Sequence, residues 1–301
     1  MFLPNLTLVF LYGFPDKPQA SQRFVDAFLA GAAWSDVERK HGGAAACAAL
    51  YVDLYAHARQ HSEIAAWQCV LGALHYYGLG GAKQDAPLAA EWFQRAVEQG
   101  LMRAHVSLGH FHMIGTGVAK DEVRAVQLFQ LAADQGNAAG QLDLGVCYLT
   151  GTGTSKNEYL AAQLFQLAAD QGIAFAQLTL GSCYALGQGV AKDETRAAQL
   201  YQLAADQGNA EAQSILGVFY CNGTGVTKNE TRAAQLFQLA ADQGLAAAQF
   251  NLGVCYANGT GVLMSESKAH ELFLLSAAQG YEQAAIVIEN RNSSRFDATH
   301  S

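Results

Sequence analysis

Apolar residues recur along the chain with the spacing of amphipathic helices. In the segment from about Ala174 to Leu186, the residues Ala176, Leu180 and Tyr184 stand at i, i+4 and i+8. This spacing places them on one face of a helix. In the segment before it, Ala161, Phe165 and Ala168 stand at i, i+4 and i+7, which also describes one apolar face. The pattern therefore predicts pairs of helices that are each apolar on one side.

Three markers show that this helix pair is repeated. A Leu-Gly pair begins at Leu71, Leu108, Leu144, Leu180, Leu216 and Leu252. A Gln-Gly pair begins at Gln99, Gln135, Gln171, Gln207, Gln243 and Gln279, always in steps of 36 residues. A Gly-x-Gly motif begins at Gly78, Gly115, Gly151, Gly187, Gly223 and Gly259. Such a period is typical of a solenoid, because a single helix pair cannot bury its apolar faces and its neighbours must stack on it.

Local signals predict where the helices begin and end. Second helices are expected to start after the N-cap residues Asp121, Asn157, Asp193 and Asn229, each followed by a glutamate that suits the helix dipole. They are expected to end at the C′ glycines Gly136, Gly172, Gly208, Gly244 and Gly280. Ser265 begins a Ser-x-x-Lys sequence but stands at the same capping position, so we interpret it as an N-cap rather than a nucleophile.

The glycine that follows each repeat leucine predicts how closely the helices pack. Gly181 lies inside a predicted helix, where glycine costs about 1 kcal/mol relative to alanine. Its recurrence in every unit predicts that another helix approaches closely at this position.

The repeats divide the chain into three parts. The first full repeat is expected near Ala65, so residues 1–64 are interpreted as a helical capping region. Within this region, helical patterns run from about Ala44 to Arg59 and, more weakly, from Ser21 to Lys40. Residues 65–290 form the repeat solenoid, in which Glu282 to Glu289 resembles one more first helix. Residues 291–301 are polar and are expected to be a disordered tail.

Composition and charge exclude several classes of protein. Hydrophobic residues make up 51% of the chain and charged residues 15%, which argues against disorder. The net charge of −8 argues against nucleic acid or an anionic membrane as partner. The longest apolar run, Leu6 to Tyr12, is too short to span a bilayer, so no transmembrane insertion is expected.

The positions of the cysteines in the repeat indicate the cellular compartment of the protein. Cys147, Cys183 and Cys255 share a repeat position with Phe111 and Phe219, which predicts a buried apolar site with reduced thiols. We therefore expect a cytoplasmic protein; the alternative is a secreted or periplasmic one, if the region from Met1 to Tyr12 acts as an atypical signal.

The repeat resembles a known family. The pattern Ala-x-x-x-Leu-Gly-x-x-Tyr from Ala212 to Tyr220, Gly-x-Gly-Val from Gly223 to Val226, and Ala-x-x-x-Phe-x-x-Ala-Ala with Gln-Gly from Ala233 to Gly244 resembles the Sel1-like repeat family, which is related to tetratricopeptide repeats. The resemblance implies an all-α, right-handed α/α superhelix of about six 36-residue repeats. It also implies a role as an adaptor or scaffold. The cysteine-rich branch of that family has two regularly spaced, disulfide-forming cysteines per repeat, a pattern that this chain lacks.

Variable positions indicate where a partner would bind. Counted from the repeat leucine, positions −5, −1, +2 and +6 vary between units and lie on one stripe of the first helix. Such stripes are expected to line the concave groove of the solenoid. The predicted binding residues are Arg103, Ser107, His110, Ala139, Asp143, Val146, Phe175, Thr179, Ser182, Glu211, Ile215, Val218, Asn251, Val254 and Asn258. Second helices, by contrast, are identical over residues 127–136, 163–172 and 235–244 and carry little unit-specific information.

Phe175 is the strongest single candidate. It is aromatic at a position that holds Ala, Arg or Glu in other units, and aromatic residues often anchor interfaces. The alternative is that Phe175 packs between neighbouring helices.

These observations predict a protein-interaction scaffold that binds another protein or a peptide segment. Two alternatives are an inhibitor or immunity-type protein that neutralises a toxin or enzyme and, more remotely, a hydrolase. No convergent acid, base or nucleophile is found, so we predict neither enzymatic activity nor a cofactor. His105 and His112 occupy the positions of Gln141 and Tyr148, so the histidine cluster is interpreted as packing and not as a metal site. The sequence does not predict an oligomeric state.

Overall fold

The computed structural model describes the backbone of residues 44–290 and the side chains from residue 51 onward. Every regular element in this range is an α-helix, which confirms the all-α prediction. The helical patterns at Ser21–Lys40, the apolar region Met1–Tyr12 and the tail 291–301 lie outside the described residues. The division into a cap, a solenoid and a tail therefore stays a prediction.

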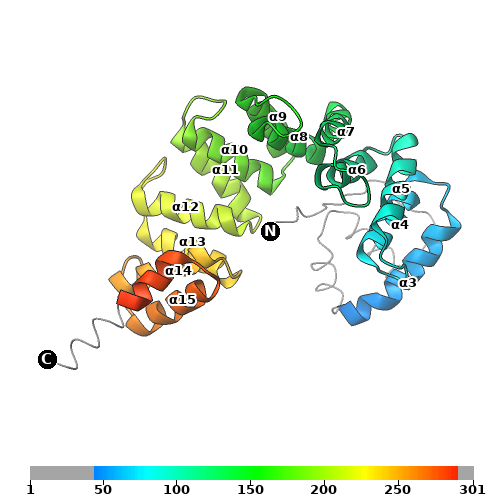
Figure 1. Cartoon of the computed structure of the whole chain (residues 1–301). Coiled ribbons are helices and arrows are strands. Elements are labelled where there is room, and N and C mark those ends of the chain that lie inside the picture. The colour runs from blue at the N-terminus through cyan, green and yellow to red at the C-terminus, as the bar shows by residue number, and fades with distance from the viewer. Residues whose placement is uncertain (1–43, 291–301) are drawn as a thin grey trace. The chain divides into compact units, whose positions relative to one another are not determined.

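The chain divides into two compact units between Asn157 and Glu158. In the first unit the helices are α3 (Ala44–Gln60), α4 (Ala65–Tyr77), α5 (Ala86–Glu98), α6 (Met102–Ile114), α7 (Glu122–Asp134) and α8 (Ala138–Thr150), as labelled in Figure 1. In the second they are α9 (Glu158–Asp170), α10 (Ala174–Leu186), α11 (Glu194–Asp206), α12 (Ala210–Asn222), α13 (Glu230–Asp242), α14 (Ala246–Asn258) and α15 (Glu266–Ala278). Residues 282–290 are also helical, as the sequence predicts.

The observed helix ends agree with the local signals. α4 begins at Ala65 and α10 spans Ala174–Leu186, both as predicted. The side chains of Asp193 and Asn229 each accept a hydrogen bond from the third backbone N–H of their helix, at 2.9 Å. Ser265 accepts from the backbone N–H of Lys268, so its assignment as an N-cap is confirmed. α9 begins directly after Asn157.

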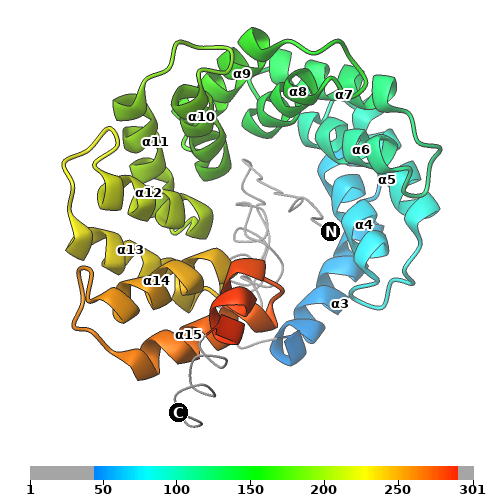
Figure 2. The ribbon, with the colours of Figure 1, turned by 60° about the vertical axis from the view of Figure 1, so that its left-hand side comes forward.

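Within each unit, every helix packs against the helix before it and the helix after it. Figure 2 shows this arrangement for the second unit, with α10, α12 and α14 in one layer and α11, α13 and α15 in the other. The glycine beside the repeat leucine permits the close approach. A β-carbon on Gly217 would lie 2.6 Å from Cε1 of Phe237, and one on Gly181 would lie 2.8 Å from Cε1 of Tyr201. The predicted role of this glycine is therefore confirmed.

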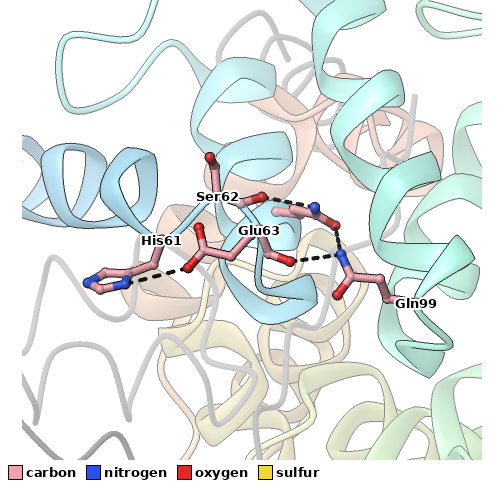
Figure 3. A network of polar contacts seen from close by, with 5 residues as sticks. His61, Ser62, Glu63 and Gln99 are labelled. Atoms are coloured by element: carbon pink, nitrogen blue, oxygen red, sulfur yellow. Dashed lines mark hydrogen bonds and ion pairs between the residues drawn. The ribbon is translucent and has the colours of Figure 1, made fainter.

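A chain of amide hydrogen bonds explains the recurrent Gln-Gly pair. In the first unit, Nε2 of Gln99 donates to the carbonyl oxygen of Glu63 at 3.0 Å and to Oε1 of Gln68 at 2.9 Å. Gln68 in turn donates to the carbonyl oxygen of Ser62 at 2.9 Å, and Figure 3 shows these contacts beside the His61–Glu63 pair. In the second unit the equivalent Nε2-to-Oε1 hydrogen bond, 2.8 Å long, joins three pairs of glutamines: Gln207 to Gln177, Gln243 to Gln213, and Gln279 to Gln249. The marker thus connects the end of a second helix to the first helix of its own repeat.

Burial confirms the packing role predicted for His105 and the buried position predicted for three of the repeat cysteines. His105 is buried at the glutamine position and its Nδ1 lies 3.0 Å from the carbonyl oxygen of Leu101. Cys147, Cys183 and Cys255 are buried and free. Burial, followed by the nearby carboxylates of Asp143 and Glu122, raises the pKa of the Cys147 thiol to about 12, so this cysteine is an inert core residue.

Candidate partner-binding surface

In the second unit, the variable positions of the first helices lie at the surface to different degrees. Phe175 and Leu186, at the two ends of α10, are 50% and 68% exposed. Between them, Thr179 and Ser182 are half-buried, and their hydroxyls donate to the carbonyl oxygens of Phe175 and Leu178 at 2.8 and 3.1 Å. Phe175 is therefore not enclosed between helices, contrary to the alternative in which it packs there.

The same positions on α12 and α14 continue this surface. Glu211 and Val218 on α12 are exposed and Ile215 is half-buried. On α14, Asn251 and Val254 are half-buried and Asn258 is exposed. We call the set on α10, α12 and α14 the first-helix stripe; it consists of Phe175, Thr179, Ser182, Leu186, Glu211, Ile215, Val218, Asn222, Ala247, Asn251, Val254 and Asn258.

One member of the first-helix stripe is fixed by the core. The hydroxyl of Ser182 lies 3.1 Å from the hydroxyl of Tyr201 on α11, where the other second helices carry phenylalanine. Burial raises the pKa of Tyr201, which keeps its hydroxyl neutral and able to donate. The contact with Tyr201 therefore fixes the Ser182 side chain, whereas the apolar side chains of Phe175 and Leu186 extend from α10 without a hydrogen bond.

In the first unit the predicted residues are less open. Ala139 and Asp143 on α8 are half-buried and Val146 is exposed. On α6, Ser107 is only 2% exposed, so its place in the predicted binding set is wrong: its side chain is enclosed by the packing around α6. Arg103 is half-buried, and burial, opposed by the neighbouring Cys69 thiol, lowers the pKa of its guanidinium to about 10.

His110 and Asp143 form an ion pair that links α6 to α8. His110 Nε2 lies 2.9 Å from Asp143 Oδ2, and the imidazole tilts over the ring of Phe129 at a centroid distance of 5.2 Å. Burial lowers the pKa of His110, but the charge and hydrogen bond of the Asp143 carboxylate outweigh it and raise the pKa above its ordinary value. Both residues belong to the predicted set, yet the sequence did not predict that they pair with each other rather than with a partner.

The chemistry of the first-helix stripe is apolar and neutral polar. Glu211 is its one charged residue; the other members are aliphatic or aromatic, or carry hydroxyls and amides. Among the described residues, no group of three or more His, Cys, Asp and Glu side chains is placed to hold a metal ion. No helix in the described range is long and apolar enough to cross a bilayer. This surface suits contact with a polypeptide better than with a polyanion.

Sequence reasoning missed a second exposed feature. The second helices carry a leucine at the same repeat position, and it is about half exposed in each of Leu131, Leu167, Leu203, Leu239 and Leu275. Three of them, Leu131, Leu167 and Leu239, lie in the identical segments that the sequence analysis described as carrying little unit-specific information. Their signal was present in the helical spacing, because the leucine falls on the face opposite to the buried Ala-x-x-x-Phe-x-x-Ala positions.

Comparison with solved structures identifies similar proteins. The protective antigen c5321 of uropathogenic Escherichia coli, which displays an SLR fold, is 29% identical with a TM-score of 0.67; the match covers 88% of this chain and 53% of that one. A Sel1 repeat protein from Oxalobacter formigenes is 30% identical with a TM-score of 0.69, covering 75% of this chain and 65% of that one. The chain thus spans about half to two thirds of the length of these relatives.

A third similar structure, immunity protein Pa5087 from Pseudomonas aeruginosa, is 24% identical with a TM-score of 0.43, and the match covers 77% of this chain and 81% of that one. This similarity is too low to support a conclusion about function. No curated protein sequence matches the chain significantly.

The family assignment rests on the repeats themselves. The profile of the Sel1 repeat matches six consecutive segments, at residues 68–101, 103–137, 138–173, 174–209, 210–245 and 246–281. Their starts are 35 or 36 residues apart, and each segment covers all or most of one first helix and the whole of one second helix. The chain belongs to the Sel1 repeat family.

Proposed function

We propose that the chain is a protein-interaction scaffold that binds a polypeptide partner through the first-helix stripe of its second unit. The observation that carries the proposal is the exposure of large apolar side chains at positions that vary between otherwise similar repeats. Phe175 and Leu186 at the two ends of α10 and Val218 on α12 are exposed, whereas the repeat leucines on the same helices are buried.

The neutral polar residues support this assignment. Asn222, Asn251 and Asn258 offer side-chain amides that both donate and accept hydrogen bonds, as a peptide backbone requires. Apolar anchors surrounded by such groups are typical of protein-binding surfaces, and aromatic residues often supply much of the binding energy. Family membership supports the same general role, because Sel1 repeats typically serve as interaction scaffolds.

The test compares two exposed aromatic residues of the same unit. Phe175→Ala removes the proposed anchor, and Tyr159→Ala removes an exposed aromatic residue of the second helix α9 that lies outside the stripe. Both variants and the unmodified chain serve as baits in lysate of the source organism, and retained proteins are quantified by mass spectrometry. We expect a partner that the unmodified chain and Tyr159→Ala retain and that Phe175→Ala loses at least about tenfold, corresponding to about 1.4 kcal/mol.

Circular dichroism of the three proteins provides the control. Helical content should be equal, because Phe175 and Tyr159 are both largely exposed. Equal retention of every captured protein by Phe175→Ala and by the unmodified chain would refute the role of this residue. A loss of helical content would show instead that Phe175 has a structural role.

A further inference from the structure

A second exposed stripe runs along the second helices of the second unit. We call it the second-helix stripe; it consists of Arg196, Gln199, Leu203 and Asp206 on α11 and of Arg232, Gln235, Leu239 and Asp242 on α13. Steps of three, four and three residues place the four members on one face of each helix. Leu203 and Leu239 are 51% and 49% exposed, and only Arg232 among the polar members is partly buried.

The charges along the second-helix stripe run against the helix dipole. Arg196 stands in the first turn of α11 and Asp206 in the last turn, which contains no basic residue. α13 has the same order with Arg232 and Asp242. A helix is stabilised by acidic residues near its N-terminus and basic residues near its C-terminus, typically by about 0.3–1 kcal/mol each. The observed order therefore does not serve the stability of the isolated helix.

Among the residues that the structure describes, no ion pair joins the side chains of these arginines and aspartates to an opposite charge. Asp206 and Asp242 accept hydrogen bonds from Gln202 and Gln238 at 2.7 Å, and neither forms an ion pair within the described residues. The Arg196 guanidinium lies 4.8 Å from the centroid of the Tyr184 ring, and Arg232 Nη1 donates to Gln235 at 3.5 Å. Along the second-helix stripe, each helix thus carries a positive residue near its start, an apolar centre and a negative residue near its end. The acidic residues of the same first turns, Glu194 and Glu230, pair with Lys192 and Lys228 at 2.7 Å.

We propose that the second-helix stripe is the contact surface for a second copy of this chain. The two copies are related by a two-fold axis that lies in the plane of the contact and runs perpendicular to the helices. Each helix then meets its own counterpart in the antiparallel direction, α11 against α11 and α13 against α13 of the second copy. Arg196 then faces Asp206 of the second copy, and its dipole-opposed charge is matched by a carboxylate. The register that pairs these residues also pairs Gln199 with Leu203 of the second copy, because both pairs are centred on residue 201 of the helix.

The leucines complete the match. In this register the two copies of Leu203 are offset by four residues, or about 6 Å along the helix axis, so their side chains meet diagonally. The same geometry holds on α13, where both pairs are centred on residue 237. A stripe with opposite charges at its ends complements itself in the antiparallel direction, whereas a uniformly acidic or basic partner would match only one end. Such a closed, isologous contact is the usual form of a dimer.

The size of this surface sets the expected affinity. Stable interfaces bury about 800 Å² per partner, and two four-residue stripes provide less. We therefore expect a weak, reversible dimer with a dissociation constant on the order of 10 μM. Sedimentation of the full chain from about 1 to about 200 μM should show monomer at the low end and dimer at the high end.

A matched pair of variants locates the contact. Leu203→Lys with Leu239→Lys should raise the dissociation constant at least about tenfold, because two like charges replace the apolar centre. Leu186→Lys, which alters an exposed leucine of the first-helix stripe in the same unit, should leave dimerisation unchanged. This control also separates the dimer from the proposed partner-binding surface.

Charge exchange tests the register and remains informative even if the lysine variants fold poorly. Arg196→Asp with Arg232→Asp should weaken the dimer about tenfold, and adding Asp206→Arg with Asp242→Arg should restore it. The fourfold variant places its charges as the helix dipole favours, so its Tm should be no lower than that of the unmodified chain. A chain that stays monomeric at about 200 μM, a dimer that the leucine variants leave intact, a loss caused by Leu186→Lys, or a failure of the charge exchange to restore association would overturn the proposal.

Discussion

His110, whose side chain is 12% exposed, shows how one largely enclosed residue responds to two opposed effects on its pKa. Burial disfavours its imidazolium form, while the carboxylate of Asp143, 2.9 Å from Nε2, favours it, and the net result is a raised pKa. Its Nδ1 has no hydrogen-bond partner among the described residues. The charged form of His110 therefore depends on Asp143 alone, which makes the pair a pH-dependent link between α6 and α8.

The link should stabilise the fold below neutral pH. Because the pKa of folded His110 exceeds its unfolded value, the stabilisation is fully present below about pH 6.5 and disappears as pH rises through the folded pKa. We expect His110→Gln to reduce the free energy of unfolding more at about pH 5.5 than at about pH 8, measured by urea denaturation. Asp143→Asn should remove the same pH dependence. A gap between the unmodified chain and His110→Gln that grows with pH would contradict this account.

At the scale of the element, the repeat is defined by how tightly its two helices approach. Gly217 on α12 lies against the buried ring of Phe237 on α13, and a β-carbon there would be 2.6 Å from Cε1. The ring cannot move aside because it is enclosed in the core. The cost of glycine inside a helix is thus offset by the packing that it permits.

Gly217→Ala should consequently destabilise a helix in which alanine is normally preferred. We expect the free energy of unfolding to fall by about 1–3 kcal/mol, the usual cost of overpacking. In a Phe237→Leu background, which removes the nearest colliding atom Cε1 together with Cζ, the same substitution should be neutral or stabilising by up to about 1 kcal/mol. Urea denaturation of the four proteins gives a double-mutant cycle. Additive effects in this cycle would show that the glycine and the ring are independent.

Helix boundaries were predicted well because their signals are local. The N-cap aspartate or asparagine, the following glutamate and the C′ glycine act within a single turn, and α11 and α13 begin directly after the predicted N-caps Asp193 and Asn229. The starts of the first helices have no such uniform capping signal in the sequence. Asn137 and Asn209 cap α8 and α12 with their side chains, while Ile173 stands at the same position before α10 and makes no such bond. There the preceding C′ glycine and the packing suffice to start a helix.

At the scale of the whole molecule, the loops hold successive repeats together. Gly225, in the loop between α12 and α13, lies against the backbone of Glu194 at the start of α11 in the repeat before it, and a β-carbon would collide with that carbonyl oxygen. Gly208 also has a positive φ, of 86°, but nothing lies within 4 Å of where its β-carbon would be. The two glycines share a backbone requirement and differ in the contact between repeats.

The comparison of these glycines isolates that contact. Gly208→Ala should cost about 1–2 kcal/mol from the left-handed backbone alone. Gly225→Ala should cost about 1–3 kcal/mol more than Gly208→Ala, because the loop must also move away from α11. Hydrogen exchange should show faster exchange in α11, α12 and α13 for Gly225→Ala than for Gly208→Ala, with α4 and α5 unaffected in both, since repeats couple to their nearest neighbours. Equal effects of the two substitutions would refute a role of the loop in joining repeats.

The sequence by itself determined the helix pair, its 36-residue period, the caps and the buried columns, because each rests on local propensity or on positions that recur in register. The tertiary structure alone decided which variable positions are open. Phe175 and Ser107 both stand at variable positions of first helices, yet the first is half exposed and the second is enclosed. Exposure depends on side chains from other repeats, distant in sequence, as does the pairing of His110 with Asp143; no pattern within one repeat contains that information.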